Sequence, residues 1–349
     1  MSTIVVTGAA GRVGRRVLAL LAEAPDVDRV VAVDVTTVPV VDPKIERHRL
    51  DVRRDDTGPL LHGADALVHL AFADGDGDGR RNRRAGDATA LLLAAAADAG
   101  VDHVVALSSA LVYGAWPNNP LPLTEDAPLR PSAALPFAVE RARAELLLAS
   151  WGADDPHRVV AVLRPCTALA PDGSSWMARS LAAATGLRSL EEEPPRQFLH
   201  LDDLATALEL VRRTRLDGPC NVAPDGWIPG DVVRELGGVA PHPAMPLRLA
   251  RLLARIRWRF QRGPIPPGLV PYTAYPWLVA NDRLKAAGWR PRYTNEQAYV
   301  AGTEARWWTM LSPKRKQELA LGGAGVGVVG LGVGIALLVR RLVRRARRT

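Results

Sequence analysis

Three glycines and one carboxylate near the N-terminus have the types and the spacing to hold a dinucleotide. Gly8, Gly11 and Gly14 lie in the run Thr-Gly-Ala-Ala-Gly-Arg-Val-Gly, and Asp34 follows 20 residues after the last of them. Such glycines allow a tight turn, bring backbone amides close to a diphosphate, and let a helix pack against a strand. A carboxylate at this distance accepts hydrogen bonds from ribose hydroxyls. We therefore predict a dinucleotide site, with an ordinary glycine-rich turn as the alternative.

Two charged side chains bear on which dinucleotide would bind. Asp34 would repel a 2′-phosphate, which favours NAD. Arg12 lies inside the glycine loop and could neutralise such a phosphate, which would favour NADP. Because the carboxylate makes the more direct contact with the ribose, we expect NAD.

A strand and a helix must flank these glycines if the loop is to bind phosphates. Residues 4–6 are β-branched and apolar, as in a buried parallel strand, and residues 15–21 place apolar side chains at helical spacing. The same alternation continues, with strands expected near 3–7, 29–34, 47–51, 65–71, 102–108 and 158–163, and helices at 12–23, 84–99 and 136–151. This order predicts an α/β fold, a Rossmann-type doubly wound parallel sheet.

The pattern divides the chain into three parts. Residues 1–165 form the expected cofactor domain. From Ala168 the sequence becomes irregular and rich in proline, so residues 166–311 are expected to form a smaller substrate lobe interleaved with the last sheet elements. Residues 312–349 form a separate basic and hydrophobic segment. Cys166 and Cys220 lie far apart without metal-ligand spacing, so no metal site is expected.

The charge of the chain is concentrated at its C-terminal end. Of the formal net charge of +8, all the excess lies after residue 311, where nine Lys/Arg face one acid, Glu318. The preceding part therefore has no basic bias, which argues against nucleic acid as a partner. No signal peptide is expected at the N-terminus, where the first apolar run is the first strand.

Residues 319–339 are uncharged over 21 positions, long enough to cross a bilayer as a helix. Seven glycines in this stretch suit packed membrane helices better than a soluble helix, and the alternative is a glycine-rich tail. We expect a membrane-associated protein with a cytoplasmic globular part. A single span would put the six arginines that follow it outside the cytoplasm, whereas basic residues usually stay on the cytoplasmic side. A shallow insertion with both ends in the cytoplasm is therefore the alternative topology.

A second segment combines arginine with apolar residues at helical spacing. Its apolar stripe contains Leu249, Leu252, Leu253, Ile256 and Phe260, and its basic stripe contains Arg248, Arg251, Arg255, Arg259 and Arg262. Three interpretations remain open, namely a substrate diphosphate, an anionic lipid surface, or a solvated charged face.

Several motifs, taken in order, resemble an extended short-chain dehydrogenase/reductase of the NAD-dependent epimerase/dehydratase type, over roughly residues 3–300. Beside the glycine loop and Asp34, the motifs are Asp51-Val52, residues 68–71, Ser108-Ser109 with residues 110–114, residues 163–165, residues 198–205 and residues 288–291. The resemblance implies that Asp51 and Val52 lie by the adenine and that Ser109 hydrogen-bonds the reacting oxygen. The implied cofactor-binding set is Gly8, Gly11, Arg12, Val13, Gly14, Asp34, Asp51, Val52, Leu70, Ala71, Ser108, Arg141 and Pro165.

The chain departs from this family where the proton chemistry should occur. The family uses a Tyr-x-x-x-Lys pair on one helix face, and the matching register here has Phe137 and Arg141. Phenylalanine has no ionisable proton, whereas Arg141 can still reach ribose hydroxyls. Thr167 stands where many sugar-nucleotide members have Asn. Other candidates for the proton donor are Tyr113, His200, Glu125 and Asp126.

Two functions are therefore expected from the sequence. The first is an NAD-dependent epimerase/dehydratase-like oxidoreductase with Ser109, Phe137 and Arg141 at the catalytic positions. Its substrate would carry a hydroxyl or keto group, for instance a nucleotide sugar or a lipid-linked sugar at a membrane. The second is a catalytically inactive, membrane-anchored NAD-binding sensor or scaffold, and a homodimer is open for either.

Overall fold

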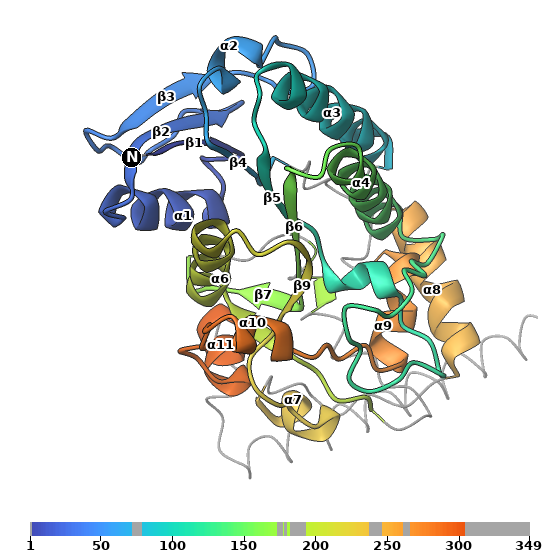
Figure 1. The fold of residues 1–349 in the computed structure, drawn as a ribbon. Helices are drawn as coiled ribbons and strands as arrows, with labels where there is room; N and C mark the ends of the chain where they lie inside the picture. The colour runs from blue at the N-terminus through green and yellow to red at the C-terminus, as the bar shows by residue number, and fades with distance from the viewer. Residues whose placement is uncertain are drawn as a thin grey trace, which may run out of the picture.

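The computed structural model describes residues 2–71, 79–172, 177, 180–181, 193–236, 246–260 and 266–303 (Figure 1). For residues 79–87, 247 and 259 only the backbone is described. The predicted membrane segment 319–339 lies outside these residues. Within the described ranges, no helix combines the length and the apolar character needed to cross a bilayer.

Seven parallel strands form the central sheet, in the order β3-β2-β1-β4-β5-β6-β9. Their bounds are β1 (Ser2–Thr7), β2 (Val27–Asp34), β3 (Ile45–Arg49), β4 (Ala66–His69), β5 (His103–Leu107), β6 (Val159–Pro165) and β9 (Gly218–Val222). The predicted Rossmann-type parallel sheet is confirmed, with six strands close to their expected positions. The sequence did not indicate β9, because its residues Gly-Pro-Cys-Asn-Val do not form an apolar run.

Helices cover both faces of the sheet, as a doubly wound fold requires (Figure 1). Helices α1 (Arg12–Glu23) and α6 (Leu201–Thr214) pack together on one face, where Leu18 and Leu204 are buried. The other face carries α2 (Gly58–Leu61), α3 (Gly79–Asp98) and α4 (Pro136–Ala153), where Leu92 and Leu148 are buried. Two separate apolar layers therefore hold the sheet between them.

The remaining elements gather at one end of the sheet (Figure 1). Strands β7 (Thr167–Leu169) and β8 (Phe198–His200) form a small parallel pair. The short 3-10 helix η1 (Ala110–Tyr113) follows β5, and η2 (Pro267–Leu269) precedes α9. The helices of this region are α7 (Gly230–Leu236), α8 (Leu247–Arg259), α9 (Val270–Ala274), α10 (Asp282–Ala286) and α11 (Asn295–Gly302).

Candidate functional site

A pocket lies at the carboxyl ends of the central strands. The chain builds β1, β2 and β3 toward one edge and then β4, β5 and β6 toward the other, so the strand order reverses between β1 and β4. Open α/β sheets bind ligands at this point of reversal. The sheet side of the pocket is lined by Gly8, Gly11, Arg12, Val13, Gly14, Leu70, Leu107, Ser108, Ser109 and Pro165.

Helix α4 and the smaller lobe supply the rest of the pocket wall. Phe137 and Arg141 line it from α4, and Leu201 and Leu204 line it from α6. Leu111 lines the pocket from η1, and Trp277 lines it from the segment after α9. The chain after β6 supplies Cys166, Thr167, Ala168, Met177 and Leu181. The pocket thus joins the predicted cofactor loop to the predicted catalytic helix.

The glycine loop is as tight as the sequence predicted. Gly8 has a φ of 73°, and a Cβ on it would lie 2.7 Å from the backbone N of Ala71. A Cβ on Gly14 would lie 2.3 Å from the carbonyl oxygen of Gly8, so no side chain fits between loop and helix there. Gly11 precedes α1 and offers no side-chain oxygen to its first amides. The positive end of α1 therefore faces the pocket, as a diphosphate requires.

The carboxylate of Asp34 is fixed beside this loop. Its Oδ2 accepts from the Ala10 amide at 3.0 Å, and its Oδ1 accepts from the amide and hydroxyl of Thr36 at 2.9 and 3.0 Å. Asp34 ends β2, the strand beside β1, so its carboxylate lies next to the glycine loop that follows β1. A 2′-phosphate placed there would meet a carboxylate, which favours NAD over NADP.

Asp51 and Val52 follow β3, the next strand outward. The Asp51 carboxylate accepts from Arg53 Nε at 2.7 Å and Nη2 at 2.8 Å, and these bonds lower its pKa. Val52 is buried. Four of the residues predicted to bind the cofactor, namely Asp34, Asp51, Val52 and Ala71, are not among those that line the pocket.

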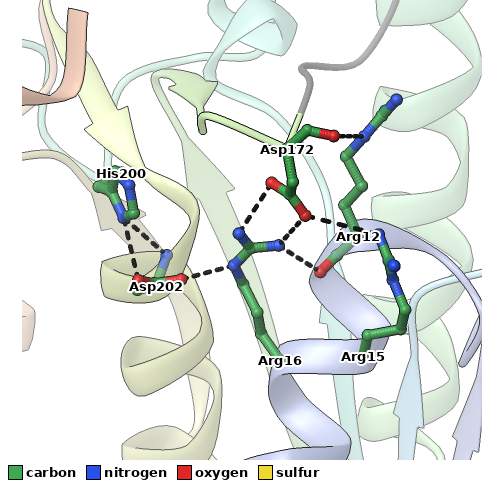
Figure 2. Close-up of polar contacts among 6 residues, drawn as sticks. All are labelled: Arg12, Arg15, Arg16, Asp172, His200 and Asp202. Carbon is green, nitrogen blue, oxygen red and sulfur yellow. Dashed lines mark hydrogen bonds and ion pairs between the residues drawn. The ribbon is translucent and has the colours of Figure 1, made fainter. Parts of the chain in front are cut away.

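An ion-pair cluster fixes the start of α1 to the smaller lobe (Figure 2). Arg16 donates to Asp172 Oδ1 at 2.9 Å and Oδ2 at 3.0 Å, and its Nε donates to Asp202 at 2.5 Å. Arg15 reaches the same Asp172 carboxylate at 3.5 Å, and Arg12 Nε donates to the Asp172 carbonyl at 3.4 Å. The segment after β7 and the start of α6 are thereby held against the helix that follows the glycine loop.

Two adjacent serines follow β5 and have different partners. The Ser108 hydroxyl donates to the carboxylate of Glu145 on α4, so it is directed away from the pocket although Ser108 lines it. Ser109 Oγ accepts from the Leu111 amide at 3.3 Å and caps η1. Its hydroxyl proton can therefore be donated to a group in the pocket, which suits the role predicted for Ser109.

Phe137 and Arg141 lie one helical turn apart on α4, and both line the pocket. Arg141 is buried, its Nη1 donates to the Leu107 carbonyl at 2.7 Å, and its guanidinium carbon lies 5.0 Å from the centre of the Phe137 ring. The guanidinium thus brings a fixed positive charge to the pocket wall. The aromatic ring beside it carries no hydroxyl.

The other proton-donor candidates do not line the pocket. Tyr113 is fully buried, its hydroxyl donates to Asn221 at 2.8 Å, and burial raises its pKa to about 12. His200 caps α6 through its Nδ1 and stacks on Tyr293 at 3.9 Å. Glu125 accepts from the Asn221 amide at 2.9 Å, and Asp126 is exposed. These four side chains have structural or solvent-facing roles here.

Several pocket residues carried no signal in the sequence. Met177, Leu181 and Trp277 come from segments distant in sequence. They form one apolar cluster with the Phe137 ring and with Leu111, which belongs to the motif that begins at Ser108. No spacing rule relates residues that meet only through the fold. Thr167, which stands where many sugar-nucleotide members have Asn, does line the pocket.

Comparisons with known proteins agree with this geometry. The sequence model of the NAD dependent epimerase/dehydratase family matches residues 4–223. A UDP-glucose 4-epimerase of Azospirillum brasilense is 28% identical over 274 residues, covering 67% of this chain and 75% of that protein. An uncharacterised protein of Mycobacterium tuberculosis is 25% identical over 311 residues, covering 85% of this chain and 82% of its own length.

Solved structures of this kind share the fold. MoeE5 in complex with UDP-glucuronic acid and NAD superimposes with a TM-score of 0.64 at 22% identity, covering 88% of this chain and 99% of that one. A UDP-N-acetylglucosamine 4-epimerase from Methanobrevibacter ruminantium superimposes with a TM-score of 0.65 at 19% identity, covering 86% of this chain and 96% of that one. With the family match over most of the sheet and its glycine loop, the resemblance seen in the sequence is confirmed, and the chain belongs to the NAD-dependent epimerase/dehydratase family.

Proposed function

We propose that this protein binds NAD at the carboxyl edge of its sheet and oxidises or reduces a hydroxyl or keto substrate without the usual tyrosine. The observation that carries the proposal is a single pocket that joins the glycine loop to Ser109 and Arg141. Structures of relatives such as MoeE5 and a Thermus thermophilus UDP-glucose 4-epimerase contain NAD, which supports this cofactor. The tight loop and the fixed Asp34 carboxylate support it independently.

Each part of the cofactor has residues that fit it. The amides at the start of α1 would hold the diphosphate, Asp34 would accept the adenosine ribose hydroxyls, and Arg141 would bind the nicotinamide ribose. When bound, NAD supplies a hydride acceptor or donor at its nicotinamide ring. Ser109 would donate a hydrogen bond to the substrate oxygen and so orient the carbon that reacts.

Two observations bear on the class of substrate, namely the ligands of a similar protein and the apolar side chains of the pocket wall. Structures of MoeE5, which shares this fold, hold UDP-glucuronic acid or UDP-glucose, which supports a nucleotide sugar. The described pocket wall beyond Ser109 is largely apolar, with Leu111, Met177 and Trp277 facing the same space as Phe137. We therefore propose a substrate whose oxidised or reduced carbon sits against an apolar surface, whether in a nucleotide sugar or a lipid-linked sugar.

A second candidate function is NAD binding without turnover, as in a sensor or scaffold. The described polar side chains of the pocket are hydroxyls, guanidinium groups and the Cys166 thiol. Hydroxyls and guanidinium groups do not change their protonation state near neutral pH, and burial raises the pKa of Cys166 far above its usual range. None of these groups replaces a tyrosine as general acid or base, which is what favours this candidate.

NAD binding should be measurable by calorimetry on the whole chain, and Gly14→Ala is expected to weaken it by about 10-fold or more. The added Cβ would lie 2.3 Å from the Gly8 carbonyl, so α1 must move away from the loop that holds the diphosphate. A 10-fold change corresponds to about 1.4 kcal/mol, a small part of the cost of such a displacement.

Gly58→Ala is the matched control for this measurement. Its Cβ would meet only the flexible Asp56 side chain at 3.2 Å, so the affinity for NAD should stay unchanged. NADP should bind more weakly than NAD because its 2′-phosphate would meet the Asp34 carboxylate. Absence of heat with both cofactors would contradict the proposed function outright.

We further propose that residues 319–339 attach the protein to a membrane with its globular part in the cytoplasm. The support is the uncharged run of 21 residues flanked by basic residues. Deleting residues 312–349 removes no described element. Once membranes are washed with concentrated salt, which removes proteins held by surface charge, the shortened chain is expected in the soluble fraction and the full chain in the membrane fraction. Fractionation after lysis, followed by blotting, measures this, and an unchanged distribution would refute the attachment.

A further inference from the structure

Helix α8 (Leu247–Arg259) lies on the outside of the smaller lobe, beside α9 (Figure 1). Its inner face carries the small side chains of Ala250 and Ala254, which are buried and cluster with Val270, and the half-buried Trp258 one turn further on. The helix therefore attaches to the protein through a narrow contact. Most of its circumference remains at the surface.

The outer face of α8 carries large apolar side chains, where a helix that faces only water usually carries polar ones. Five large side chains are 40–67% exposed, namely Leu249, Leu252, Leu253, Ile256 and, at the C-cap, Phe260. At about 100° per residue, they fall within an arc of roughly 100°. They form one continuous exposed apolar stripe, and such patches mark interaction surfaces.

Arginines border this apolar stripe on both sides. Arg248, Arg251 and Arg255 lie along one edge, and Arg257 lies on the other. All four are exposed, none forms an ion pair with a carboxylate of the described residues, and the helix contains no acidic residue. Of the predicted basic stripe, Arg262 lies outside the described residues and only the backbone of Arg259 is described.

We propose that α8 docks onto the surface of an anionic lipid bilayer. The apolar stripe would enter the boundary between headgroups and acyl chains, and the flanking guanidinium groups would reach lipid phosphates at the same depth. A second copy of this helix fits poorly because its arginines would face like charges. The exposed stripe is also a convex helix surface, whereas a partner peptide helix is usually held in a groove. The arginines match the anionic headgroups, and the apolar stripe matches the acyl chains beneath them.

The test uses the full chain with a fluorescent probe on a single introduced cysteine. Both native cysteines, Cys166 and Cys220, are buried, so a thiol-reactive probe labels Leu252→Cys selectively. Val300→Cys on α11 is the matched control, because Val300 is 58% exposed and Leu252 is 52% exposed. The labelled proteins are mixed with phosphatidylcholine vesicles with and without phosphatidylglycerol, carrying a spin-labelled lipid as quencher.

The spin-labelled lipid is expected to quench the Leu252 probe in phosphatidylglycerol vesicles and not the Val300 probe. Iodide in the water should do the reverse. Raising the salt concentration, or replacing Arg248, Arg251 and Arg255 with glutamine, should remove the lipid quenching at Leu252, since these arginines are exposed and their replacement leaves the fold intact.

Two outcomes would overturn the proposal. If the Leu252 probe stays as accessible to iodide as the Val300 probe while the protein sediments with the vesicles, the protein is held there without α8. If the Leu252 probe becomes shielded without vesicles and the molecular mass rises, α8 contacts a second copy. Because the probe reports the depth of α8 itself, neither loss of NAD binding nor attachment through residues 319–339 changes the reading.

Discussion

Replacing Phe137 with tyrosine and Arg141 with lysine together is expected to raise nicotinamide-dependent turnover by about 10²–10⁴-fold, the usual contribution of a positioned general acid or base. Both side chains line the pocket, and they lie one helical turn apart on α4. A hydroxyl on the Phe137 ring would enter the space that Ser109 also faces. A lysine at position 141 would lower the pKa of that hydroxyl through its charge.

The assay follows reduced nicotinamide spectroscopically, with UDP-glucose and UDP-glucuronic acid as probe substrates, at several pH values. A new tyrosine should add a titration to the rate profile that the parent protein lacks. Phe137→Leu with Arg141→Lys is the matched control, since it changes both positions and adds no hydroxyl. If the parent protein already converts substrate as fast as the tyrosine variant, the missing hydroxyl at position 137 does not lower the rate. Another group would then have to move the proton.

Arg141 shows why the cofactor half and the chemical half of this site can separate. Its buried guanidinium is held by the Leu107 carbonyl and lies over the Phe137 ring, so it keeps a positive charge in the pocket. That charge suits binding to ribose hydroxyls, whereas proton transfer needs a group that titrates near the working pH. A protein can therefore keep its affinity for NAD while it lacks the group that transfers the proton. Calorimetry measures the affinity, and kinetics measures the rate of turnover.

The cofactor loop was predictable because its requirements are local. A buried strand, three glycines and an amphipathic helix are adjacent in sequence, and the predicted helix 12–23 agrees with α1 residue for residue. The two positions of the family's Tyr-x-x-x-Lys pair, here Phe137 and Arg141, could be located for the same reason, since they lie one helical turn apart. Patterns of this kind need no knowledge of the tertiary fold.

The substrate wall could not be predicted in the same way. Met177 and Trp277 are 100 positions apart in the sequence and meet only because the segments after β7 and α9 fold over the same end of the sheet. The Arg16 cluster is similar, because Asp172 and Asp202 reach α1 from more than 150 residues away. Arginine and aspartate at such distances have no periodicity that would single them out.

A buried polar network joins three of the segments that line the pocket. Arg164, at the end of β6, donates to the Glu145 carboxylate on α4 at 2.7 and 2.9 Å and to the Tyr113 hydroxyl, after Ser109, at 2.7 Å. Arg164 and Glu145 are both more than nine-tenths buried. Since Glu145 also accepts from Ser108, the network fixes α4 against the ends of β5 and β6.

Replacing Arg164 with methionine is accordingly expected to lower the free energy of unfolding by about 3–5 kcal/mol, the usual cost of breaking a buried ion pair. Methionine fills much of the same space, but it leaves the Glu145 carboxylate buried with the Ser108 hydroxyl as its remaining described partner. Urea denaturation followed by circular dichroism measures the loss. The double variant Arg164→Met with Glu145→Leu should recover most of it, because no uncompensated charge then remains.

Arg29→Met is the matched control for this measurement. Arg29 pairs with Glu46 at the surface, where both side chains are about half exposed, so its loss should cost about 0–1 kcal/mol. If Arg164→Met is as mild as Arg29→Met, the buried network does not hold α4 in place. The position of Arg141 in the pocket would then depend on Arg141's own contacts, such as the bond to the Leu107 carbonyl, and on the apolar packing of α4.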